Sequence, residues 1–194
     1  MARLFLDRID AHTADIDRLS ARIDEAMEPF QAARELLCSI PGISTTIAEV
    51  FVAETGADMS VFPTAGHLAS WAGTAPGSNE SAGRVKSTKT RPGNRYLKGA
   101  LGTAALSASR SKGTYFSAKY KRIAARRGPM KALVAVEHAM LVAAWHMLSN
   151  GEFYRDPGAN YYTARQPAKT KARAITQLQS LGFKVTLQPF ADTA

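Results

Sequence analysis

The chain has 194 residues, 45% of them hydrophobic, and a formal net charge of +9 at pH 7. This length allows one globular domain with an appendage, or two small units, and the hydrophobic fraction is sufficient for a buried core. The single cysteine, Cys38, excludes an internal disulfide framework and any cysteine-rich zinc site, and it is consistent with a reducing, cytoplasmic location.

The positive charge is concentrated in the middle of the chain. Residues 81–136 hold 14 Lys or Arg residues and no Asp or Glu, which leaves 11 of the 25 basic residues with all 16 acidic residues elsewhere. A basic centre in an otherwise acidic chain is typical of a protein that binds a polyanion. Nucleic acid is the partner we expect; an acidic membrane surface and an unpartnered solvated face are the alternatives.

A seven-residue repeat predicts that residues 1–35 form a coiled-coil helix. Both positions of the seam are mostly apolar, with Ile9, Ile16, Ile23 and Phe30 at the first and Phe5, Leu19, Ala26 and Ala33 at the second. His12 interrupts the seam, and Pro29 predicts a kink or a break. We expect this helix to join copies of the chain into a homo-oligomer or to form a helical hairpin arm. A single amphipathic helix lying on its own domain is the alternative.

Residues 34–56 predict a helix, a tight turn of sequence IPGI (40–43) and a second helix. This pattern resembles a helix-hairpin-helix element, in which backbone N–H groups at the turn face a phosphate. Gly42 and Ser44 are therefore candidate nucleic-acid contacts, although Ser44 stands where that element usually has a second glycine. The alternative is that the turn serves only packing.

The remaining sequence also favours helices, at 64–72, 94–109, 115–126, 129–150 and 169–181, with loops at 73–93 and 151–168. Residues 185–187 could form a short strand. The fold class is therefore mainly α, with a helical domain over 36–150 and a C-terminal tail over 151–194. The apolar stretch at 132–148 is short for a membrane span and is interrupted by polar residues, so we expect a buried helix and no membrane partner.

The segment GTAPGSNESAGRVKSTKTRPGNRYLKGA (73–100) combines small residues with dense positive charge. Six basic residues in its second half are candidate nucleic-acid contacts: Arg84, Lys86, Lys89, Arg91, Arg95 and Lys98. Ser81 is followed by Ala82 and Gly83, so a bulky backbone could approach its hydroxyl. Arg84 and Lys86 could then hold a phosphate or stabilise the charge developing on it. The alternative is that Ser81 is an ordinary turn residue, as most loop serines are.

A serine must be activated before it attacks. Glu80 precedes Ser81, but neighbouring side chains in an extended segment point apart, so the spacing does not identify Glu80 as the base. The histidines show no metal-ligand spacing, and no acidic cluster resembles a two-metal nuclease site. We therefore expect this chain to hold no metal or cofactor.

Six short segments occur in a recognisable order: SIPGI (39–43), AETG (53–56), FPT (62–64), LASWAG (68–73), APGSNESAG (75–83) and RPGNRYL (91–97). This ordered set resembles the C-terminal transposase domain of the insertion-sequence one-ten type of DEDD transposases, which are bridge-RNA-guided recombinases. The resemblance covers nearly the whole chain from Leu36 onward.

The resemblance implies a two-part enzyme. An N-terminal RuvC-like domain would hold four acidic residues that bind Mg²⁺, and a coiled coil would lead into a domain whose serine attacks a DNA phosphodiester and forms a phosphoserine link. Ser81 matches that serine. Arg84, Lys86 and Lys89 match basic residues that would contact the DNA or guide-RNA backbone.

The chain departs from the family pattern because it starts inside what would be the coiled coil, without the RuvC-like domain. The expected partners are then DNA, a guide RNA and an RuvC-like domain, and Mg²⁺ is expected only in that domain. One hypothesis is the catalytic-serine half of a DNA recombinase, active when complemented. A second is a truncated, non-catalytic fragment that binds nucleic acid or dimerises, and a third is a helical remnant with no activity.

Overall fold

The computed structural model describes residues 2–77 and 79–188. Its elements in chain order are α1 (Ala2–Met27), η1 (Glu28–Phe30), α2 (Gln31–Cys38), α3 (Thr45–Thr55), η2 (Met59–Val61), α4 (Ala65–Trp71), β1 (Asn79–Ser81), β2 (Arg84–Ser87), α5 (Arg95–Arg110), α6 (Tyr115–Arg127), α7 (Pro129–Asn150), α8 (Tyr161–Arg165) and α9 (Pro167–Ser180). The protein is mainly helical, as the sequence predicts.

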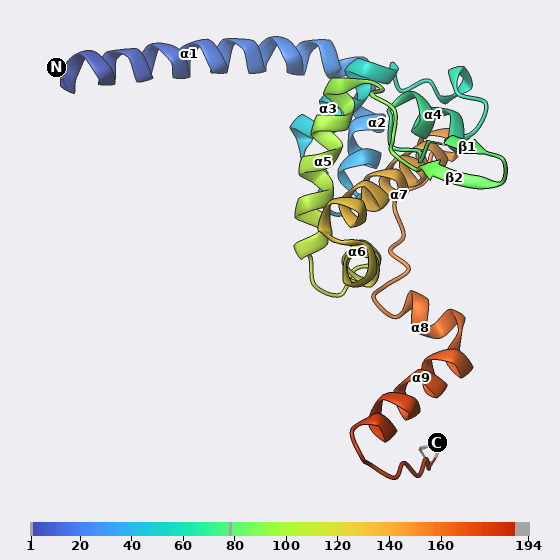
Figure 1. The fold of residues 1–194 in the computed structure, drawn as a ribbon. Helices are drawn as coiled ribbons and strands as arrows, with labels where there is room; N and C mark the ends of the chain where they lie inside the picture. Colours follow the sequence, from blue (N-terminus) through green and yellow to red (C-terminus); the bar gives the residue numbers. More distant parts are fainter. Residues whose placement is uncertain (1, 78, 189–194) are drawn as a thin grey trace.

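Helix α1 projects away from the helical body as a long arm (Figure 1). Its apolar seam is open to solvent, and Phe5, Ile16 and Leu19 are each about 60% exposed. The helix ends at Met27, and a single 3₁₀ turn containing Pro29 separates it from α2. The break predicted at Pro29 is therefore confirmed, while the coiled-coil pairing stays a prediction.

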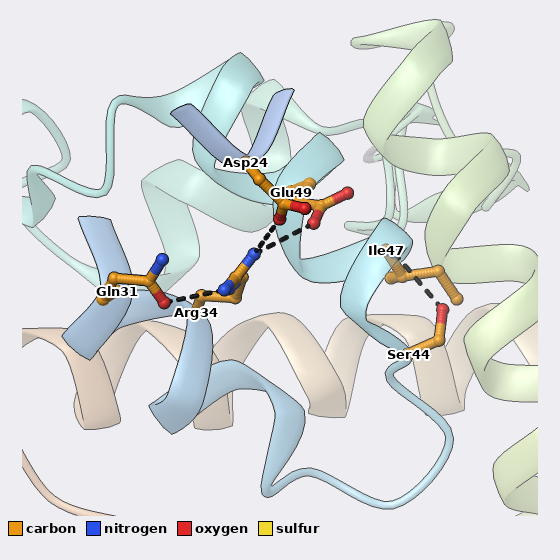
Figure 2. A network of polar contacts seen from close by, with 6 residues as sticks. All are labelled: Asp24, Gln31, Arg34, Ser44, Ile47 and Glu49. Carbon is orange, nitrogen blue, oxygen red and sulfur yellow. Dashed lines mark hydrogen bonds and ion pairs between the residues drawn. The ribbon is translucent and has the colours of Figure 1, made fainter. Parts of the chain in front are cut away.

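Arg34 ties the base of this arm to the body (Figure 2). Its Nη1 lies 2.9 Å from Oδ1 of Asp24 on α1 and 3.3 Å from Oε1 of Glu49 on α3. Its Nη2 donates to Oε1 of Gln31 at 2.7 Å. One guanidinium thus links three helices, because its donors form a rigid planar fork.

Helix α7 is the centre of the body, packed against α6, α5, α4 and α2. Pro129 starts it and Gly151, in the left-handed region, ends it. Met140, Leu141 and other buried side chains of α7 join one core with α3, α4, α5 and α6. By length and composition alone α7 could cross a membrane. Its contacts on several sides instead make it the core helix of this fold.

The predicted helix–turn–helix over 34–56 is present as α2 and α3. The Ser44 hydroxyl caps α3 by accepting from the Ile47 N–H at 3.4 Å (Figure 2). Gly42, at φ +94°, packs against α5, where an added Cβ would collide with the Ala104 carbonyl oxygen. This close approach explains the glycine, since no other residue would fit there.

The expected loop over 73–93 is wrong in part, because β1 and β2 form an antiparallel hairpin within it. The base of this segment, where residues 73–77 run beside residues 89–93, is called the neck here, and glycines let its two strands of backbone come close. An added Cβ on Gly93 would collide with the backbone of Gly73, and one on Gly77 would collide with the Lys89 carbonyl oxygen. The two ends of the segment therefore run against each other, and the hairpin stands out from the body (Figure 1).

The C-terminal tail also differs from the prediction. The expected loop over 151–168 contains the short helix α8 and the start of α9, and residues 183–188 form no strand. Helix α8 is held by aromatic contacts, with the rings of Tyr161 and Tyr162 each within 6 Å of Tyr115 on α6. Arg122 lies over the Tyr162 ring at 4.5 Å. Such contacts depend on α6 and could not be read from local sequence.

Candidate nucleic-acid interface

Ser81 lies at the tip of the hairpin, directly opposite Arg84. The two residues between them, Ala82 and Gly83, have φ angles of +52° and +72°. A two-residue hairpin turn of this kind needs positive φ at both positions, because only then does its twist match that of the strands. Ala82 adopts this conformation at a cost of roughly 1–2 kcal/mol, since its Cβ crowds the following carbonyl.

The pairing decides which side chains share a face with the Ser81 hydroxyl. Directly opposite residues on an antiparallel pair project to the same side, with Cβ atoms about 4.5–5.5 Å apart. Ser81 and Arg84 therefore share one face, and Glu80 and Val85 share the other. Arg84 therefore lies on the same side of the hairpin as the Ser81 hydroxyl, whereas Glu80 lies on the other side.

The Ser81 side chain is exposed. Among the described residues, no hydrogen bond engages its hydroxyl. The pairing register shifts between Asn79 and Glu80, so that Lys86 is an extra residue in β2. A bulge of this kind re-aims the side chains around it. The basic residues that follow Ser81 therefore do not simply alternate between the two faces.

The other predicted contacts from this segment are spread around the neck. Lys98 reaches back from α5, and its Nζ donates to Thr90 Oγ1 at 3.3 Å and to the Arg91 carbonyl at 3.4 Å. Arg95 lies over the ring of Tyr96 at 4.8 Å, and both are exposed. Lys98 thus braces the segment, while Arg95 stays available at the surface.

Gly42 and Ser44 lie in a different part of the body, at the turn between α2 and α3. The structure gives Gly42 a packing role against α5 and gives the Ser44 hydroxyl a capping role. Both observations favour the packing alternative for this turn. A nucleic-acid contact there stays a prediction.

The sequence did not indicate which residues of α6 and α7 lie across a groove from β2. Lys119 on α6 and Lys131 and His138 on α7 line a groove of about 960 Å³ together with Lys86 and Lys89. The only sequence signal for these lysines is that residues 81–136 contain no Asp or Glu. That signal could not show which of its lysines lie together, because their proximity depends on how α6 and α7 pack.

Two titratable groups lie on α7 beside this basic surface, the buried Glu137 and the half-buried His138. Burial raises the pKa of the Glu137 carboxyl, and the positive charge of Lys98 partly opposes this effect. Burial, with a smaller contribution from Lys119, lowers the pKa of the His138 imidazole. Both effects favour the neutral forms, because desolvation penalises charge. No three His, Cys, Asp or Glu side chains within the described residues come together as metal ligands would.

The fold and the site define a mainly helical module that presents a serine-tipped hairpin within a strongly basic surface. Residues 34–121 match the model of the transposase IS116/IS110/IS902 family. The match begins in α2 and ends in α6, so it includes the hairpin and its neck. It agrees with the resemblance drawn from the ordered sequence segments and supports this family for the chain.

Individual relatives point the same way. The chain is 31% identical over 140 residues to the uncharacterized 43.6 kDa protein of insertion element IS110 from Streptomyces coelicolor, covering 70% of this chain and 33% of that protein. It is 32% identical over 152 residues to the uncharacterized 42 kDa protein of insertion element IS900 from Mycobacterium paratuberculosis, covering 75% and 36%. A putative transposase from Sinorhizobium fredii is 26% identical over 166 residues, covering 80% and 43%. The chain thus spans about a third of the length of the first two relatives.

Proposed function

We propose that this chain is the serine-bearing, nucleic-acid-binding part of an insertion-sequence transposase, and that the Ser81 hydroxyl attacks a DNA phosphodiester. The observation that carries the proposal is the pairing of Ser81 with Arg84 at the tip of an exposed hairpin. The hairpin lies in a region without acidic residues. The similarity to transposases supplies DNA as the substrate.

The proposed step exchanges one phosphodiester for another. The bond from Ser81 Oγ to phosphorus forms while the bond from phosphorus to a deoxyribose oxygen breaks. The hydroxyl proton passes to a base, and the departing sugar oxygen acquires a proton. Arg84, on the same face, offers a planar pair of donors to the phosphate oxygens as negative charge builds on them.

The base is not on the Ser81 face of the described hairpin, because Glu80 projects to the opposite side. We therefore propose that a further domain or a second chain supplies it. This fits the RuvC-like partner that the family resemblance implies. The Mg²⁺ of that partner would be held by its own acidic residues. A guide RNA, a homo-oligomer joined through α1 and a cytoplasmic location belong to the same proposal.

The test mixes this chain with target DNA, guide RNA and a separately produced RuvC-like domain. We expect a covalent protein–DNA band on a denaturing gel that disappears in Ser81→Ala. Ser107→Ala is the matched control, since it removes an exposed hydroxyl from α5, outside the hairpin and the groove, and should keep the band.

A second candidate function is a non-catalytic module that only binds nucleic acid. The lack of a hydrogen-bond partner for the Ser81 hydroxyl among the described residues favours it. Under that alternative no covalent band forms in any mixture, while binding to DNA persists in both variants.

A further inference from the structure

A groove with basic walls lies between the hairpin segment and helices α6 and α7. One wall is β2 and the residues after it, up to Thr90, and the other is formed by α6 and α7. Its volume of about 960 Å³ is within the range of sites that enclose a small ligand, roughly 300–1,000 Å³. It could take a nucleotide, whereas a duplex would be far too wide.

Four lysines line the groove: Lys86, Lys89, Lys119 and Lys131. Within the described residues none of them pairs with a carboxylate, and the lining contains no Asp or Glu. Lys119 Nζ donates to the Tyr115 hydroxyl at 3.3 Å, which leaves it other donors. An occupant must therefore bring negative charge, and several lysines on flexible stems suit phosphates met at varied angles.

The remaining lining is largely apolar. It includes Val85 from the hairpin, Ile123 from α6 and Met130 and Val134 from α7. Met130 is 72% exposed and Val85 63% exposed, so apolar surface is open to solvent beside the lysines. An inorganic anion would leave this surface in water, whereas a ligand with a flat apolar part would cover it.

The groove also lies on the opposite side of the hairpin from the proposed nucleophile. Val85 lines it, and Val85 projects from the face of β2 opposite to Ser81 and Arg84. Lys86 is the extra residue in β2, and because of this bulge it lines the groove next to Val85. The hairpin can thus contact one nucleic-acid segment at its tip and another in the groove.

We propose that this groove holds one unpaired nucleotide of a single strand, with its phosphates on the four lysines and its base on the apolar surface formed by Val85, Ile123, Met130 and Val134. The proposal rests on nucleic-acid binding by this chain, and it adds a binding site that does not include Ser81. A positively charged groove with apolar contacts for bases is the usual chemistry of single-strand binding.

The test compares two double variants that each remove two positive charges. Lys119→Gln with Lys131→Gln alters the groove from its helical side. Lys121→Gln with Arg126→Gln is the matched control, because both residues are exposed on α6 outside the groove. Each protein is titrated with a labelled 12-nucleotide single strand and with the duplex of the same sequence, over a series of salt concentrations.

We expect the groove variant to bind the single strand about tenfold more weakly, with a slope of log K against log salt smaller by about 1.4, since each lost phosphate contact on a single strand contributes about 0.7. Duplex binding by the groove variant should match that of the control. Equal weakening of single-strand binding in both variants would overturn the proposal, because only the total charge would then matter.

A second measurement locates the base directly. Ultraviolet irradiation of the wild-type chain with a single strand carrying 5-bromodeoxyuridine should crosslink to a peptide containing Met130 or Val134. A crosslink confined to the hairpin tip would overturn the groove site and leave the proposed function standing. If the chain binds no nucleic acid at all, both the groove site and the proposed function are overturned. A polyglutamate peptide that binds as tightly as the single strand and displaces it would also overturn the groove site, because the surface would then bind any polyanion.

Discussion

At the scale of single residues, Arg84 is the basic residue paired directly with Ser81, so we expect it to contact the phosphate that Ser81 attacks. Both residues project from the same face of the hairpin, while Lys86 lines the groove. We expect Arg84→Gln to reduce covalent attachment to DNA by about 100-fold, because it removes charge stabilisation at the reacting phosphate. Lys86→Gln should reduce it less than tenfold. The rate of band formation measures both, and equal losses would contradict the assigned geometry.

Gly42 offers a test of packing at the α2–α3 turn. We expect Gly42→Ala to lower the free energy of unfolding by about 3 kcal/mol, since the methyl group would collide with α5 as well as strain a positive φ. Gly56→Ala is the matched control. Its φ is +68° and an added Cβ there would meet nothing within 4 Å, so only about 1 kcal/mol of strain is expected. Urea denaturation measures both, and equal losses would argue against close packing of the turn on α5.

Glu137 should make stability depend on pH. Burial raises the pKa of its carboxyl above the ordinary value of 4.5, so the folded state favours the neutral acid. The stabilisation from this group is therefore complete below the ordinary value and is lost as pH rises through the raised pKa. We expect Glu137→Gln to flatten this decline in urea denaturation as the pH is raised above the ordinary value of 4.5. Glu152→Gln, at an exposed position, should leave the decline unchanged.

At the scale of elements, the arm α1 leaves its apolar seam open to solvent at Phe5, Ile9, Ile16 and Leu19. Its apolar seam is exposed, and a solvent-exposed seam of this length is typical of a helix that pairs with another. We expect the chain to be oligomeric in light scattering at about 50 µM, and Ile16→Glu with Leu19→Glu to convert it to monomer, because charges at seam positions prevent packing. Asp17→Ser, off the seam, is the control. A monomeric wild-type chain would contradict this expectation.

The elements that sequence predicted well are those whose signals are local. The Ile40–Ile43 turn and the proline at 29 mark helix boundaries by backbone chemistry alone, and both boundaries are confirmed. The hairpin was missed because its turn has Ala82 where glycine or asparagine would be expected. Helix α8 was missed because its stability comes from aromatic contacts with α6. In the candidate site, composition and resemblance predict Ser81 and Arg84, but their shared face follows only from the strand register.

At the scale of the whole molecule, the fold separates three tasks along one chain. The arm α1 projects from the body, α7 lies at the centre of the body, and the hairpin stands out from it (Figure 1); we propose that the arm serves association and the hairpin the chemistry. The hairpin is fixed to the body by the glycine contacts of its neck and by Lys98. The tip is thus exposed while its base is packed, an arrangement that fits the proposed role of Ser81.

The central claim is tested most directly by identifying the atom that becomes joined to DNA. The complemented reaction is digested with nuclease and protease, and the peptide containing residues 79–84 is sequenced by mass spectrometry. We predict a nucleotide attached through phosphate to Ser81, and no adduct on this peptide in Ser81→Ala. An adduct on another residue, or one that persists in Ser81→Ala, would contradict the account.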